Sequence, residues 1–132
     1  MTKQELSQLY YLNGEIEQLK NRITELECVA TSTSSRITGM PHTSGISDKV
    51  GKYVAEIADL KELLDLNLKK CFYELNRLNR YIEGIDNSEM RMILSLRYIN
   101  GLSWEQVAVS ISPYASGESV RKSHDRFLRK SQ

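Results

Sequence analysis

The sequence predicts an all-α fold, in which long N-terminal coiled-coil helices are followed by a C-terminal three-helix helix-turn-helix domain. Two long segments carry apolar residues spaced alternately three and four apart, which is the heptad pattern of coiled-coil helices. The rest of the chain contains short periodic segments that begin at capping residues and end at Gly or Pro. We therefore expect a coiled-coil region over residues 1–85, with a linker at 31–47, and a helix-turn-helix domain over residues 86–132.

The first heptad segment predicts one helix over residues 3–30. Its apolar stripe is narrow and is flanked by charged residues, which is typical of a coiled-coil helix rather than of a globular one. Gly14 lies inside this helix and costs about 1 kcal/mol relative to Ala, which a packing partner must offset. The stripe consists of Leu9, Leu12, Ile16, Leu19, Ile23, Leu26 and Ala30.

Residues 31–47 are rich in Ser, Thr and Gly, contain Pro41 and show neither helical nor strand periodicity. This composition predicts a loop or flexible linker. The single His42 within it has no neighbouring Cys, Asp or Glu at a metal-binding spacing, so we assign it no ligand.

The second heptad segment predicts a helix over residues 48–85. Ile57, Leu60, Leu64 and Leu68 follow at steps of three, four and four, which cover 11 residues. The pattern therefore predicts a hendecad slip that leaves Asn67 out of the seam and places Leu68 in it. Helices this long can be buried only against each other or against a second copy. We expect a homodimer through the coiled coil, and an antiparallel hairpin of the two helices within one chain is the alternative.

The C-terminal third predicts three short helices. Asp86 with Glu89 resembles a capping box that opens a helix over residues 87–100, and Gly101 ends it. Ser103 with Gln106 resembles a second capping box, at the start of a helix that reaches Ile111. A basic helix over residues 118–130 follows the breakers Pro113 and Gly117. The apolar faces of the last two helices predict a core made of Trp104, Val107, Ala108, Ile111, Val120, His124, Phe127 and Leu128.

Composition excludes several classes of function. No window approaches the roughly 18 consecutive apolar residues of a membrane span, and the N-terminus lacks a signal-peptide pattern, so we expect a cytoplasmic protein without membrane association. Cys28 and Cys71 are far apart without a CxxC spacing, which predicts reduced thiols and no zinc site. No catalytic set, metal cluster or phosphate-binding glycine loop is present. We therefore expect a protein that is not an enzyme and uses no cofactor.

The distribution of charge points to the C-terminus. The net charge is only +1, but residues 115–132 carry five basic side chains against two acidic ones, whereas residues 1–30 carry three against five. A basic cluster at a chain end is often only a solvated helix face. It becomes informative when it coincides with a motif that binds nucleic acid.

Residues 88–130 resemble the fourth conserved region of bacterial primary sigma factors, which is a helix-turn-helix. The resemblance rests on Leu96-Arg97-Tyr98 followed by Gly101, on the SWEQVA segment, on Glu118 with Val120-Arg121, and on the RFLRK ending. Together with the coiled coil and linker, it also resembles small phage or prophage transcription regulators. The turn at residues 113–117 is longer than in the sigma pattern, which leaves the angle between the two motif helices open.

This resemblance implies a sequence-specific DNA-binding transcriptional regulator, encoded by a phage or prophage and acting on double-stranded DNA in the cytoplasm of a bacterium or infected host. A recognition helix places its N-terminal residues against base edges, so we expect Glu118, Ser119 and Lys122 to read bases. In the resembling sigma helices, the positions of Glu118 and Lys122 also face bases, and that of Arg121 approaches a phosphate. The remaining candidates are expected to contact phosphates: Arg121, Arg126, Arg129 and Lys130.

A coiled-coil adaptor or scaffold that binds another protein, such as RNA polymerase, is the alternative function. An adaptor would more often expose apolar anchors on its C-terminal helices. The outward face of residues 118–130 is instead polar and basic, which favours DNA.

Overall fold

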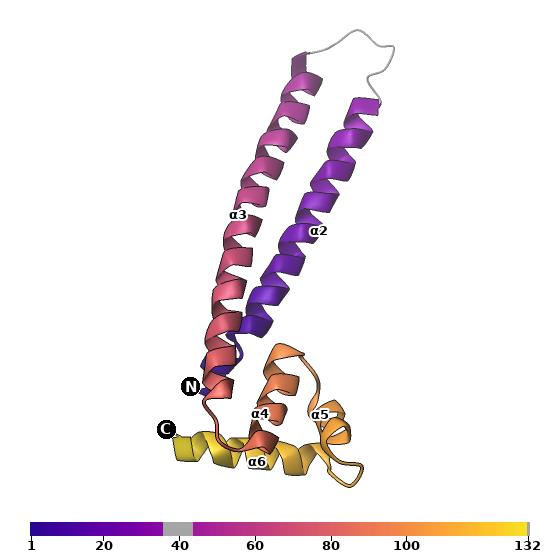
Figure 1. The fold of residues 1–132 in the computed structure, drawn as a ribbon. Coiled ribbons are helices and arrows are strands. Elements are labelled where there is room, and N and C mark those ends of the chain that lie inside the picture. The colour runs from indigo at the N-terminus through magenta and orange to yellow at the C-terminus, as the bar shows by residue number, and fades with distance from the viewer. Residues whose placement is uncertain (36–43, 132) are drawn as a thin grey trace. The chain divides into compact units, whose positions relative to one another are not determined.

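A computed structural model describes residues 1–35 and 44–131 and confirms that the chain is all-α (Figure 1). The predicted linker is shorter than residues 31–47, because residues 31–35 are helical and the next helix begins at Ser44. Pro41 and His42 lie outside the described residues. The elements are α1 (Lys3–Leu6), α2 (Gln8–Ser35), α3 (Ser44–Glu83), α4 (Ser88–Leu94), the π-helical turn η1 (Ser95–Ile99), α5 (Trp104–Ile111) and α6 (Gly117–Ser131).

The first predicted helix is divided at Ser7. Thr2 and Glu5 form a capping box that starts α1, and the backbone N–H and the hydroxyl of Ser7 both donate to the carbonyl of Lys3. Ser7 has a ψ of −6°, whereas an α-helical residue has a ψ of about −42°, so the helix is interrupted there and the prediction of a single helix over residues 3–30 is wrong at this residue. The break leaves Leu6 fully buried.

The chain forms two compact units, which are described separately. The hairpin unit is Gly14–Lys69, and the head unit combines residues 1–13 with the chain from Lys70 onward. The predicted boundary at residue 85 does not coincide with a boundary between these units. The physical reason is that Leu78, Ile82 and Ile85, near the end of α3, are buried in the core that also holds α4 and α5.

In the hairpin unit, α2 and α3 run antiparallel within one chain (Figure 1). The α2 side of the seam is buried at Ile16, Ile23 and Leu26. Two ion pairs join the helices, Arg22 with Glu56 and Lys61 with Glu27, each at 3.3 Å. Exposed pairs of this kind contribute about 0.2–1 kcal/mol each, so the apolar seam supplies most of the stabilisation. The two heptad segments therefore pack on each other inside a single chain.

The predicted hendecad slip at Leu68 is wrong. Asn67 is only 7% exposed, whereas Leu68 is 36% exposed. At 100° per residue, Asn67 lies about 40° from the direction of Cys71 in the same seam, and Leu68 lies about 60° away on the opposite side. The heptad step therefore continues through Asn67, and the four-residue steps fall later, around Cys71. A polar residue in a coiled-coil seam can fix its register at some cost in stability.

The head unit contains the main core. Asn87, rather than the predicted Asp86, caps α4 by accepting hydrogen bonds from the backbone N–H groups of Glu89 and Met90. Arg91 then bonds to the Ser88 hydroxyl and to the Ile85 carbonyl, which holds the corner between α3 and α4. The buried residues are Leu6, Leu9, Leu78, Ile82, Ile85, Met90, Ile93, Leu94, Tyr98, Val107, Ala108, Val120, His124 and Leu128.

The turn between α5 and α6 brings the two helices into direct contact. The predicted capping box of Ser103 and Gln106 is confirmed at the start of α5. Gly117 opens α6 so close to α5 that a Cβ atom there would lie 3.0 Å from the backbone nitrogen of Glu105 and 2.8 Å from its carboxylate. The Glu105 carboxylate is the flexible end of a side chain and can turn aside, but the contact with the backbone nitrogen is tighter than nine in ten real Cβ contacts, so α5 would have to give by a few tenths of an ångström.

Candidate nucleic-acid interface

The helix α6 has a buried face and an exposed face, and the expected separation between them is observed. Val120, His124 and Leu128 are buried, and Phe127 packs partly buried against the same core. The opposite face is exposed at six of the seven candidate residues, while Arg121 at the flank is half-buried. The exposed candidates are Glu118, Ser119, Lys122, Arg126, Arg129 and Lys130.

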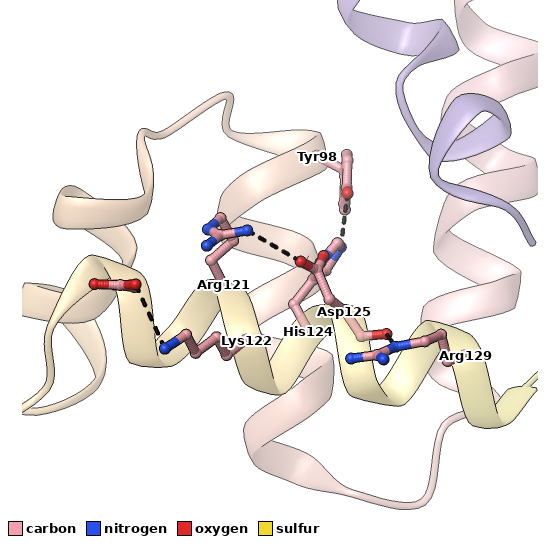
Figure 2. A network of polar contacts seen from close by, with 7 residues as sticks. Tyr98, Arg121, Lys122, His124, Asp125 and Arg129 are labelled. Carbon is pink, nitrogen blue, oxygen red and sulfur yellow. Dashed lines mark hydrogen bonds and ion pairs between the residues drawn. The ribbon is translucent and has the colours of Figure 1, made fainter.

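Two of the three expected base readers form an ion pair with each other. The Nζ of Lys122 lies 3.4 Å from the Glu118 carboxylate, one helical turn earlier (Figure 2). Both side chains are mostly exposed, and such i,i+4 pairs contribute only about 0.3–0.5 kcal/mol. A base edge that offers a better partner to either residue can therefore replace this pair at little cost.

The third expected base reader, Ser119, forms hydrogen bonds with Ser116 at the start of its own helix. Its hydroxyl donates to the carbonyl of Ser116 at 2.9 Å and accepts from the Ser116 backbone N–H at 3.3 Å. The Ser116 hydroxyl accepts in turn from the Ser119 backbone N–H. This reciprocal arrangement caps the start of α6. Ser119 thus contributes first to the start of α6.

The basic side chains of α6 differ in whether they have a partner within the chain. Arg121 pairs with Asp125 at 3.3 Å, and Nε of Arg129 donates to the Asp125 carbonyl at 3.5 Å (Figure 2). Arg126 and Lys130, by contrast, form no ion pair with any residue that the structure describes. A cation without a partner is the simplest group to place against a phosphate. Arg126 and Lys130 are therefore the most available cations on the exposed face of α6.

A buried polar network holds α6 to the helices behind it. Nε2 of His124 lies 2.7 Å from the hydroxyl of Tyr98, and its Nδ1 lies 3.0 Å from the Asp125 carboxylate (Figure 2). Because an ionised carboxylate only accepts, we assign the ring proton to Nδ1, so that Nε2 accepts from the Tyr98 hydroxyl. His124 is fully buried and both ring nitrogens are bonded, so the network joins helices and presents no ring nitrogen to solvent.

The sequence pattern Leu96-Arg97-Tyr98 has a structural explanation. The Arg97 guanidinium lies 4.6 Å from the centre of the Trp104 ring and donates to the Leu102 carbonyl. Trp104 in turn packs on the ring of His124 at 4.8 Å. Sequence reasoning placed Trp104 and His124 in the core but missed the parts played by Arg97, Tyr98 and Asp125. Only the local spacing of Arg97 and Trp104, seven residues apart, could have suggested their contact.

The pKa values in this network follow from burial and charge. Burial lowers the pKa of His124 below its usual 6.5, against the opposing effect of the Asp125 carboxylate. Burial raises the pKa of Tyr98 to about 12. Burial would also raise the pKa of Asp125, but the His124 hydrogen bond and the nearby charges of Lys3 and Arg121 keep it below its usual value. At neutral pH the network therefore contains a neutral imidazole beside an ionised carboxylate.

These pKa directions predict that stability falls in mild acid. A histidine whose pKa is lower in the folded state binds a proton more readily when unfolded, so stability is complete above about pH 6.5 and is lost as the pH falls below that value. The lowered pKa of Asp125 adds a further loss at lower pH, below 3.8. Urea melts of the full chain between about pH 7.5 and pH 5 would measure the effect. A flat midpoint over this range would contradict a neutral, buried His124.

Within the described residues, no three or more His, Cys, Asp or Glu side chains gather in a way that could hold a metal ion. None of the described helices has the length and apolar character needed to cross a membrane.

Comparison with known proteins adds no assignment. No family model matches the chain, and neither a curated protein nor a solved structure matches it.

Proposed function

We propose that this protein is a sequence-specific transcriptional regulator that binds double-stranded DNA through the exposed face of α6. The observation that supports the proposal most is the division of α6 into two faces. One face is fixed in the core by His124 and its neighbours, and the other presents exposed cations at Lys122, Arg126 and Lys130. A helix held rigidly on one side and basic on the other has the form required to enter a major groove.

In this proposal, residues near the N-terminal end of α6 contact bases and residues further along the helix contact phosphates. Lys122 and Glu118, near the N-terminal end, exchange their mutual ion pair for base edges, Lys122 donating to guanine and Glu118 accepting from cytosine. Arg126 and Lys130 contact phosphates and supply affinity without sequence information. Arg121 and Arg129 support this surface through Asp125 and reach phosphate only after those contacts change. The resemblance to sigma factors and to phage or prophage regulators points to transcription as the process.

An adaptor that binds a protein such as RNA polymerase is the second candidate, and one observation favours it. Tyr114 is 96% exposed in the turn between α5 and α6, and Val109 on α5 is also exposed. Exposed apolar and aromatic side chains are typical anchors of protein interfaces. The two candidates therefore use different residues, which makes them separable by mutation.

The test of DNA binding starts from selection of duplexes from a randomised library by the full chain at low salt. Lys122→Ala is expected to relax preference at one or two base pairs by about 1–3 kcal/mol each. Arg126→Ala is expected to weaken binding to all duplexes alike and to lower the slope of log affinity against log salt by about one. Neither side chain is in the core, so both variants should unfold like the parent.

Tyr114→Ala provides the matched control, because this residue is exposed but lies outside α6. On the DNA proposal it should leave duplex preference unchanged. If the parent shows no affinity for any duplex at low salt, the DNA proposal fails. If Tyr114→Ala then abolishes capture of RNA polymerase while Lys122→Ala does not, the adaptor function is supported.

A further inference from the structure

The hairpin unit uses its heptad seam internally, so a second copy of the chain cannot bind there without opening the hairpin. α3 nevertheless carries another stripe, displaced by one residue from the seam, in which Asp59, Leu63, Leu66 and Lys70 follow at spacings of four, three and four. Residues at these spacings share one face of an uninterrupted helix. We call these four residues the outer stripe.

The outer stripe exposes apolar surface. Leu63 is 44% exposed and Leu66 is 49% exposed, although both lie on one helix face a single turn apart. Asp59 and Lys70 are also exposed, and neither takes part in an ion pair within the part of the chain that the structure describes. The stripe thus offers two leucines between an unpaired acid and an unpaired base.

This order of residues is self-complementary in one orientation only. When two copies of the stripe meet antiparallel, Leu63 faces Leu66 of the other copy, and Asp59 faces Lys70 of the other copy. Each contact then occurs twice, as a two-fold symmetric interface requires. A parallel meeting would place Asp59 against Asp59 and Lys70 against Lys70, and like charges across an interface are unfavourable.

The opposite flank of α3 lacks this complementarity. There Leu68 and Phe72 are exposed, but the charges beside Leu68 are already paired, Asp65 with Lys69 and Lys61 with Glu27. Leu68 therefore has no free charged neighbours that could align a second copy. The outer stripe is the flank with both apolar surface and unpaired opposite charges.

We propose that a second copy of this chain binds antiparallel along the outer stripe of α3, giving a two-fold symmetric dimer. This inference does not depend on DNA binding, because it uses no residue of α6. It differs from the homodimer expected from the sequence, in which the heptad seams themselves would join two chains.

Analytical ultracentrifugation of the full chain tests the proposal, with circular dichroism to show that each variant is folded. The parent is expected to sediment as a dimer, and Leu63→Asp to raise its dissociation constant by at least about a hundredfold, because a charge would be buried beside leucine. Leu68→Asp is the matched control and should leave the dimer intact. A monomeric parent, or equal loss of the dimer in both variants, would overturn the proposal.

A charge exchange distinguishes the antiparallel arrangement from any other contact of the same leucines. Asp59→Lys and Lys70→Asp should each raise the dissociation constant by about tenfold, since each creates two like-charge pairs in the symmetric dimer. The double variant restores opposite charges at both places, so its dissociation constant should return towards that of the parent. A double variant weaker than both single variants would show that these residues do not face each other.

Discussion

Replacing Leu94 by Ala is expected to lower the free energy of unfolding by about 2–5 kcal/mol, the range for a fully buried leucine that leaves a cavity. Leu94 ends α4 and has no exposed surface. Its side chain belongs to the core that joins the last turns of α3 to α4, α5 and α6. Urea melts at about pH 7.5, followed by circular dichroism, would measure the loss. A loss of this size is a large fraction of the total free energy of unfolding of a small domain, which is about 5–15 kcal/mol.

Met92→Ala is the control for this experiment, because Met92 lies two residues earlier on the same helix and is exposed. Surface substitutions of this kind usually change stability by less than about 0.5 kcal/mol. Equal effects of the two substitutions would show that α4 is not docked as described. Phe127 is only partly buried, so Phe127→Ala should cost less than the roughly 3–5 kcal/mol of a fully buried phenylalanine.

Replacing His124 by Leu is expected to cost about 1–3 kcal/mol, chiefly because the buried Tyr98 hydroxyl loses its partner. The volume of the core changes little, so the effect reports the hydrogen bond rather than a cavity. The loss of stability in mild acid should also diminish, because the titrating imidazole is gone. Urea melts at about pH 7.5 and pH 5.5 would measure both effects.

A second substitution makes this prediction specific to the Tyr98 contact. Tyr98→Phe removes the orphaned hydroxyl, and replacing both partners of a buried hydrogen bond by apolar groups can be nearly neutral. The double variant should therefore be more stable than His124→Leu alone. Strictly additive losses from the two substitutions would mean that Tyr98 and His124 do not depend on each other.

The sequence predicted the helices better than their contacts. Heptad spacing correctly indicated two long helices, because a narrow apolar stripe can be buried only by packing on another helix. It placed Leu68 in the seam and left Asn67 out, which was wrong. Hydrophobicity favours the leucine, but the regular three- and four-residue steps of the packed helix bury the asparagine. Tertiary packing overrode the local preference.

The sequence predicted which residues of α6 face outward, but not the hydrogen bonds and ion pairs that they form. Helical spacing alone separates the buried and exposed faces of α6, so Lys122 and Arg126 could be placed on the outer face. The contact between Tyr98 and His124 joins residues 26 positions apart on different elements, and no local pattern encodes it. The local use of Ser119 and the pairing of Arg121 with Asp125 depend on side-chain rotamers, which residue type does not determine.

The close approach of Gly117 to Glu105 means that the first turn of α6 comes nearer to α5 than a residue with a side chain would comfortably allow. Whatever surface α6 meets, the angle at which it is presented depends on how near its first turn can come to α5. A methyl group at residue 117 would press on the Glu105 backbone and move the start of α6 away from α5 by a few tenths of an ångström. The far end of α6 would then swing through the largest arc, so that cations near Lys130 would move more than Glu118 while their chemistry stayed the same.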